Sequence, residues 1–278
     1  MGAWTNATGR VPSSKGVLRP ERLARTVSFD EVEPTPATAY WIERIWSVRW
    51  DLDEEAVTSI VPHPSISLTV ERGGVGREGL RGDGVWVTGV VSSRFDVTHV
   101  GTGGAVGIKF HPGGFTALTG IVAGSLTDRV VRAAELVEGF ESLAGVPLDA
   151  RGSREALCGV VAGIDAGADG MYEGVTEVLR TLRDPDVTRV DELATRCRLS
   201  PRSLQRLFQR YVGVSPKWVL RRYRLHDAMT ALDDGHVGSL ADLATELGWY
   251  DQSQFARDFT SLVGTSPSVY RDRPQPVD

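Results

Sequence analysis

The strongest constraint on this chain is a duplication in its last third, between Val190 and Arg273. The segment Leu193–Pro216 returns in altered form as Leu243–Pro267, at an offset of 50 residues at the start and 51 residues from the middle onward. Matching positions include Leu193 with Leu243, Leu204 with Phe255, Arg206 with Arg257, Phe208 with Phe259, and Pro216 with Pro267. A repeat of this length indicates a duplicated supersecondary unit.

Each copy is predicted to be two short helices joined by a tight turn, which is a helix-turn-helix unit. Residues that can cap a helix N-terminus precede the four predicted helices: Thr188, Ser200, Ser239 and Asp251. The first helix of the first copy is expected to end near Arg198. In the second copy it ends at Gly248, a residue suited to a left-handed helix stop. Leu204 and Phe208 then lie on one apolar stripe of the following helix.

The outer faces of the two second helices carry side chains that suit base recognition. These faces hold Arg202, Gln205, Arg206 and Gln209 in the first copy, and Gln252, Ser253, Ala256 and Arg257 in the second. Arginine can bond guanine through two hydrogen bonds in the major groove, and glutamine can bond adenine in the same way. A polar helix face is more often only a solvated surface, so the duplication is what favours DNA binding here.

A single helix is predicted between the two copies, beginning at Ser215 and Pro216 and ending at Gly235. About twenty residues at a rise of ~1.5 Å give a rod of roughly 30 Å. That length is close to one turn of B-DNA, about 34 Å. The rod could therefore place two reading helices in successive major grooves on one face of the duplex.

The chain has a net charge of −5, but its charges are unevenly distributed. Between Arg189 and Arg224, ten Lys or Arg residues stand against two acidic residues, whereas between Leu225 and Arg273 three stand against eight. The first unit is therefore predicted to supply most of the contacts to DNA phosphates. The candidates are Arg210, Lys217, Arg221, Arg222 and Arg224.

These features resemble the DNA-binding domain of the AraC/XylS family of bacterial transcription regulators, which has two helix-turn-helix units joined by a long helix. The resemblance covers Val190 to Arg273 and is most specific over Gly248 to Arg271, GWYDQSQFARDFTSLVGTSPSVYR. It implies base contacts from Arg202, Gln205 and Arg206 in the first unit and from Gln252, Ser253 and Arg257 in the second. Cys197 and Leu199 depart from the glycine-rich first turn that is usual in the family.

The first part of the chain has a different character. Residues 1–38 are rich in Ser, Gly, Pro, Thr and Arg without a sustained period, so a mostly disordered arm is predicted. Between Tyr40 and Phe115, six short runs rich in β-branched and aromatic residues predict an antiparallel sheet that closes into a barrel or sandwich. Val61–Glu71 and Gly107–Gly120 resemble the N-terminal domain of a group of actinobacterial AraC-type regulators.

Helical patterning is predicted between residues 121 and 182, including one helix over residues 125–143 that begins at a capping box. Arg183–Arg189 is expected to be the hinge between domains. The predicted fold class is α+β: an N-terminal antiparallel β barrel or sandwich with helices over residues 39–183, followed by an all-α domain over residues 184–278. The helices before the hinge either pair two chains or cover the sheet, and both alternatives stay open.

Several classes of function are disfavoured by the sequence. Cys158 and Cys197 are too few for a disulfide framework or a thiolate zinc site and are predicted to be core thiols. His63, His99 and His111 lack the spacing of a metal-binding cupin, so we predict neither a metal nor a cofactor. No nucleophile, base and orienting group occur together, which disfavours an enzyme. No apolar run approaches the ~20 residues that a bilayer needs, and no export signal is evident, so a cytoplasmic protein is predicted.

The sequence therefore predicts a sequence-specific transcription regulator that binds promoter or operator DNA. We expect a small-molecule effector or a partner to bind the N-terminal domain and to act through its different affinities for two arrangements of the reading helices. The alternative is a constitutive DNA binder whose N-terminal domain only dimerises. RNA polymerase and a second copy of the chain are the other candidate partners, and no membrane contact is predicted.

Overall fold

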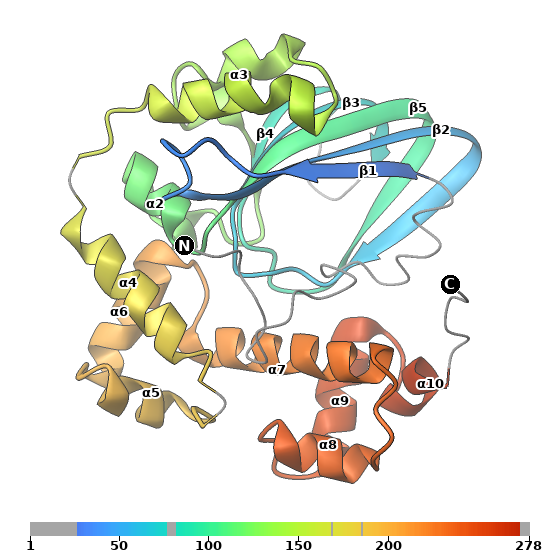
Figure 1. The fold of residues 1–278 in the computed structure, drawn as a ribbon, viewed down its shortest axis with the longest axis vertical. Coiled ribbons are helices and arrows are strands. Elements are labelled where there is room, and N and C mark those ends of the chain that lie inside the picture. Colours follow the sequence, from blue (N-terminus) through green and yellow to red (C-terminus); the bar gives the residue numbers. More distant parts are fainter. Residues whose placement is uncertain (1–26, 77–81, 168, 185, 273–278) are drawn as a thin grey trace.

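The structure is a computed structural model that describes residues 27–76, 82–167, 169–184 and 186–272. Figure 1 shows two halves: an antiparallel sheet with helices packed on it, and a set of helices formed by residues 190–272, drawn in gold to red. The predicted order of an α+β part followed by an all-α part is confirmed. Among the described residues, no helix combines the length and the hydropathy needed to cross a membrane.

The described strands form one six-stranded antiparallel sheet in the order β1-β2-β5-β3-β4-β6. Their bounds are Val27–Val32 (β1), Ile42–Ile60 (β2), Ser67–Gly76 (β3), Gly84–Thr88 (β4), Phe95–Phe110 (β5) and Val130–Arg132 (β6). Strands β2 and β5 are longer than the predicted runs. Strand β2 continues through a register shift between Leu52 and Ala56, and β5 bends at Gly101, whose φ is 57°. Each long strand therefore unites two of the predicted runs.

Strand β1 and the turn at Thr35–Thr38, with Thr38 fully buried, lie in the segment that the sequence assigned to a disordered arm, so that prediction does not hold for residues 27–38. The strand pairs with β2 from Val27 opposite Trp50 to Val32 opposite Ile45. These ladder hydrogen bonds and the burial of Val27 outweigh the polar composition of the surrounding segment. The rest of the predicted arm that precedes this strand, residues 1–26, lies outside the described residues.

Residues 125–143 do not form the predicted helix. They form short 3-10 turns, η1 (Ala123–Ser125), η2 (Ala133–Glu135) and η3 (Phe140–Gly145), with the edge strand β6 among them. Asp128 and Gly139 have left-handed φ angles of 58° and 92°, and such a residue interrupts an α-helix. Val131 and Phe140 are buried even though this segment is not helical. The helix-like spacing of its apolar residues therefore reflects packing against the sheet.

The described part of the N-terminal half also contains the helices α2 (Gly114–Thr119), α3 (Ala150–Ala162) and α4 (Gly170–Thr181). Helix α3 begins at Asp149, whose side chain accepts a hydrogen bond from the Gly152 amide at 2.6 Å. Its buried face carries Cys158, which is 2% exposed and is thus a core thiol, as predicted. Figure 1 shows α3 lying over one face of the sheet.

The C-terminal half contains the two predicted helix-turn-helix units and the long helix between them. The helices are α5 (Val190–Arg196), α6 (Pro201–Tyr211), α7 (Pro216–Asp233), α8 (Leu240–Glu246), α9 (Gln252–Val263) and α10 (Pro267–Arg271). Ser200, Ser215, Ser239 and Asp251 act as N-caps. Thr188 does not: Arg189 is the N-cap of α5, and the Glu192 carboxylate accepts hydrogen bonds from the amides of both Thr188 and Arg189.

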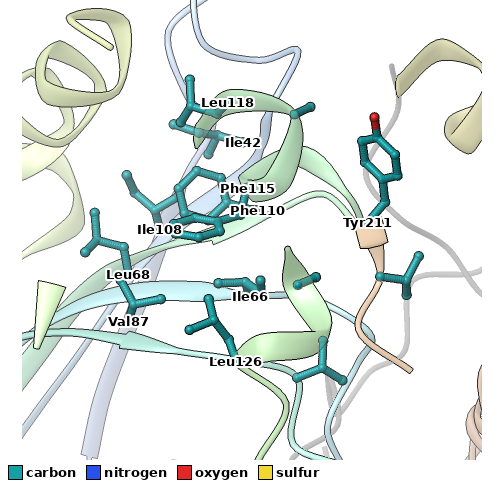
Figure 2. Close-up of a cluster of buried hydrophobic side chains, with 14 of the residues drawn as sticks. Ile42, Ile66, Leu68, Val87, Ile108, Phe110, Phe115, Leu118, Leu126 and Tyr211 are labelled. Carbon is teal, nitrogen blue, oxygen red and sulfur yellow. The ribbon is translucent and has the colours of Figure 1, made fainter. Parts of the chain in front are cut away.

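The buried core does not follow the predicted domain boundary. One cluster joins the sheet to α4, α5, α6 and the first half of α7 as far as Tyr223. Figure 2 draws part of it, with Phe110 from the sheet, Phe115 from α2 and Tyr211 from α6. The predicted hinge also contributes Val187, which is 4% exposed. The first unit is therefore built into the N-terminal half.

A second cluster begins at Leu225 and holds α8, α9 and α10 together. Among the described residues of the N-terminal half, Val61 belongs to this cluster and is fully buried. The second helix-turn-helix unit thus has a largely separate core. The division between the two clusters falls inside α7, not in the segment before α5.

The turn of each unit requires one left-handed residue, Arg198 (φ 55°) in the first and Gly248 (φ 80°) in the second. A left-handed conformation costs a residue with a side chain about 1–2 kcal/mol. We expect Arg198→Gly to raise the free energy of unfolding by about 0.5–1 kcal/mol. Gly248→Ala should lower it by about 1–2 kcal/mol, because its Cβ would also lie 3.1 Å from Thr188 Cγ2. Urea unfolding measures both changes, and a destabilised Arg198→Gly variant would contradict this account.

Candidate DNA-binding surface

Helix α6 presents the predicted base-contact residues of the first unit on one exposed face. Ser200 caps the helix by accepting a hydrogen bond from the Ser203 amide at 3.1 Å, and Pro201 occupies its first position. Leu204 and Phe208 are fully buried on the opposite face. The exposed face carries Arg202, Gln205 and Arg206. Their spacing of three and four residues places them side by side, as the sequence predicted.

Helix α9 repeats this arrangement in the second unit. Asp251 caps it by accepting a hydrogen bond from the Gln254 amide at 2.6 Å, and Phe255 and Phe259 are fully buried. Its exposed residues include Gln252, Ser253 and Arg257. The residue before the cap, Tyr250, is 91% exposed and was not singled out from the sequence. The sequence could have indicated this exposure, because Tyr250 directly precedes the predicted N-cap Asp251.

Three of the five predicted phosphate contacts lie at the surface. Arg210 and Lys217 are exposed near the junction of α6 and α7. Arg221 is also exposed, but its Nη2 lies 2.6 Å from Oδ1 of Asp258 in α9. The other oxygen of this carboxylate accepts a hydrogen bond from Trp249 Nε1 at 3.1 Å. Arg221 therefore also ties α7 to the second unit.

The remaining two candidates are engaged inside the protein. Arg222 is 4% exposed, and its Nη2 donates a hydrogen bond to the Ser92 carbonyl oxygen at 2.9 Å. Burial lowers the pKa of Arg222 to about 9, so the side chain stays protonated at pH 7. Arg224 donates hydrogen bonds to the carbonyls of Gly248 and Thr188. The guanidinium groups of these two residues are thus engaged by carbonyl groups of the protein itself, which a count of charges along the sequence cannot reveal.

The N-terminal half holds the end of α6 directly. Thr116 Oγ1 donates a hydrogen bond to the Arg210 carbonyl at 3.3 Å, and Thr127 Oγ1 donates one to the Gly213 carbonyl at 2.6 Å. Gly124 of η1 lies so close to Gln209 that a Cβ at position 124 would overlap the Gln209 amide. Gln209, the last residue of the predicted reading stripe, therefore faces the N-terminal half.

Two histidines stack where the loop between β2 and β3 meets α7. The rings of His63 and His226 lie 4.1 Å apart between centroids and are nearly parallel, at 9°. Desolvation by burial lowers the pKa of His226 to about 3, and the nearby Arg222 and Lys109 add to this effect. Burial, followed by the charges of His226, Lys109, Arg44 and Arg222, holds the pKa of His63 well below 6.5. Both rings are therefore neutral at pH 7.

The histidines singled out from the sequence do not gather into a metal site. His63 belongs to the stack, and the His99 ring lies 4.7 Å from the ring of Trp50. Burial lowers the pKa of His111, as it does that of His99. Within the part of the chain that the structure describes, no group of three or more His, Cys, Asp or Glu side chains is arranged to hold a metal ion.

The comparisons with known proteins agree with this geometry. Residues 193–273 match a family model described as a helix-turn-helix domain, and residues 30–132 match a domain of unknown function, DUF6597. The XylDLEGF operon transcriptional activator of Pseudomonas putida is 33% identical over 88 residues, which are 31% of this chain and 26% of that protein. An HTH-type transcriptional regulator of Mycobacterium tuberculosis is 35% identical over 83 residues, covering 30% of this chain and 32% of the relative.

Among solved structures, ToxT from Vibrio cholerae O395 covers 89% of this chain and 97% of its own, with 12% identity and a TM-score of 0.42. The chain spans about a quarter (26%) of the length of the first curated relatives that it matches. The fold and the two exposed stripes define a protein with tandem helix-turn-helix units on one connecting helix. Residues 193–273 match the helix-turn-helix domain model and are similar in sequence to part of these transcriptional regulators.

The neutral histidine stack generates a prediction about acid stability. Both pKa values are lower in the folded state, so the unfolded chain binds protons below pH 6.5 that the folded chain excludes. The contribution of these two histidines to the free energy of unfolding is therefore fully present above pH 6.5 and is lost as the pH falls below it. Each histidine should contribute up to about 1.4 kcal/mol per pH unit.

We expect His226→Phe, which preserves an aromatic ring at the stack, to reduce the loss of unfolding free energy between pH 7 and pH 5. Denaturant unfolding at a series of pH values measures this slope for the variant and the unaltered protein. His99 and His111 contribute in the same direction and remain in both proteins, so the slope should shrink without vanishing. An unchanged slope would show that His226 is not neutral in the folded protein.

Proposed function

We propose that this protein is a sequence-specific DNA-binding transcription regulator of the AraC/XylS type. The supporting observation is the pair of exposed stripes on α6 and α9, which lie in units at the two ends of α7. This helix has 18 residues, which at 1.5 Å per residue span about 27 Å. One turn of B-DNA, about 34 Å, is of similar length, so α6 and α9 would enter successive major grooves on one face.

In this proposal the two units have different tasks. Base edges are read by Arg202, Gln205, Arg206, Gln252, Ser253 and Arg257. Phosphates are contacted mainly from the first unit, by Arg210 and Lys217, with Arg221 at the edge of the contact. Between Leu225 and Arg273 acidic residues outnumber basic ones eight to three, so the second unit adds specificity more than attraction to DNA. The protein acts by binding, without catalysis, in the cytoplasm where bacterial DNA lies.

The same proposal gives the N-terminal half a regulatory role. A small-molecule effector or partner that binds residues 39–183 would reach the DNA-binding half, residues 184–278, through the contacts to α6 and α7. It would shift the regulator only through different affinities for two arrangements of these helices. RNA polymerase is a further proposed partner, and a homodimer through the helices before residue 190 is another. If the N-terminal half only dimerises, footprints on DNA will be the same with and without cell metabolites.

The central arginine of the first stripe offers a direct test. We expect Arg206→Ala to weaken binding to an operator selected from random duplexes by about 1–3 kcal/mol and to relax preference at one base pair. Binding to a library of single-base variants of that operator measures both effects. The control is Arg151→Ala, which removes a 79% exposed arginine from α3, far along the chain from both stripes. Unchanged base preference in Arg206→Ala would remove this residue from the reading set.

The phosphate contacts have a separate signature in salt dependence. We expect the double change Arg210→Ala and Lys217→Ala to weaken binding to specific and random duplexes alike. The slope of log affinity against log salt concentration should fall by about 2, roughly one for each phosphate contact. Titrations at several salt concentrations, with Arg151→Ala again as the control, measure the slope. A slope equal to that of the unaltered protein would contradict the assignment.

A further inference from the structure

One loop of the N-terminal half contacts both the connecting helix α7 and helix α9 of the second helix-turn-helix unit. In this β4–β5 loop, residues 89–94, the Ser92 carbonyl oxygen accepts hydrogen bonds from Trp218 Nε1 at 3.0 Å and from Arg222 Nη2 at 2.9 Å. Both donors lie on the first half of α7, next to the first unit. At the other end of the loop, Arg94 Nη1 donates a hydrogen bond to the Val263 carbonyl at 3.2 Å. Val263 is the last residue of reading helix α9.

Asp128 fixes the position of Ser92. Its carboxylate accepts hydrogen bonds from the Ser92 amide at 2.6 Å and from Ser92 Oγ at 2.8 Å. The Asp128 amide in turn donates to the Val90 carbonyl at 3.0 Å. Asp128 has a left-handed φ of 58°, a conformation that persists when its surroundings determine it strongly. The adjacent Thr127 holds the Gly213 carbonyl, so the segment that positions the loop also contacts the end of α6.

The hydrogen bond from Arg222 Nη2 to the Ser92 carbonyl gives an acceptor to a buried charged group. The guanidinium carbon lies 4.3 Å from the centre of the Trp218 ring, and the residue is only 4% exposed. A buried cation that loses a hydrogen-bond acceptor is strongly disfavoured. The Ser92 carbonyl and this part of α7 therefore move together.

Helix α7 needs this support because its two halves belong to different cores. Tyr223 packs in the first cluster and Leu225 in the second, so a small bend between them would change the angle between α6 and α9. Val61 joins the second cluster, and His63 stacks on His226 just beyond the division. The N-terminal half thus contacts α7 on both sides of the point at which it would bend.

We propose that the β4–β5 loop, held by Asp128, sets the distance and angle between the two reading helices, and that Ser92 and Asp128 are positioning residues for operator spacing. This inference rests on the proposed DNA-binding function. It assigns part of the spacing specificity to residues outside the helix-turn-helix units. A ligand that displaced the loop would change which spacing the protein prefers.

The test uses the full chain and an operator that it selects from random duplexes. One base pair is then inserted or deleted between the two half-sites. For the unaltered protein we expect affinity to fall at least about tenfold with either change, because both helices must meet their grooves together. In Asp128→Ala the same changes should reduce affinity less than about threefold, because the reading helices can readjust. The matched control is Asp83→Ala, which removes a carboxylate that accepts a hydrogen bond from the Gly73 amide within the sheet.

A second variant removes the contact from the other side. Trp218→Phe keeps an aromatic ring under Arg222 but lacks the Nε1 donor to Ser92, and it should also tolerate altered spacing. If Asp128→Ala fails to fold, the affinity of Trp218→Phe for operators of altered spacing tests the inference instead. The inference is overturned if a folded variant is penalised for altered spacing as severely as the unaltered protein.

A measurement without DNA separates this inference from the proposed function. Spin labels at Thr195→Cys in α5 and Thr260→Cys in α9, in a Cys197→Ser background, report the distance between the two units. We expect a narrow distance distribution that broadens in Asp128→Ala. Equal widths would contradict the inference. Failure to select any duplex would instead count against DNA binding itself, whatever the distance distributions show.

Discussion

The apolar contact between the sheet and the first helix-turn-helix unit determines how the rest of the molecule is arranged. Tyr211 and Val212, at the end of α6, are 2% and 1% exposed, and they belong to the same buried cluster as the sheet. The Tyr211 hydroxyl donates to the Asp169 carboxylate, which also caps α4. Burial of such side chains typically contributes about 1.5–3 kcal/mol each. The reading helix is therefore part of the N-terminal core.

This arrangement makes the two copies of the duplicated unit unequal. The first is basic and packs against the N-terminal half, whereas the second is acidic and has its own core. In the function proposed above, the first unit therefore supplies most of the attraction to DNA, and the second adds sequence selection. The first half of helix α7 packs in the cluster shared with the N-terminal half, and its second half packs in the cluster of the second unit. Contacts along α7 therefore affect the orientation of both units.

The sequence predicted the C-terminal half well because its signals are local. Caps such as Ser200 and Asp251 and the spacing of Phe255 and Phe259 depend only on nearby residues. The predicted helix over residues 125–143 failed because its burial pattern arises from pairing with β4, which sequence spacing cannot reveal. The burial of Arg222 was missed for the same reason, because the carbonyl that accepts its hydrogen bond is 130 residues away along the chain. The exposure of Arg202, Gln205 and Arg206 was predicted from the spacing, but the contact of Gln209 with Gly124 and the other contacts that orient α6 were not.

The left-handed turns of the two units differ in the residue that occupies them. The copy supported by a neighbouring domain carries Arg198 at its tightest point, whereas the copy that stands more alone has the conformationally permissive Gly248. External support relaxes the demand for an ideal local sequence. The first unit can therefore accept a turn residue with an intrinsic conformational cost, because contacts with the N-terminal half help to hold its fold.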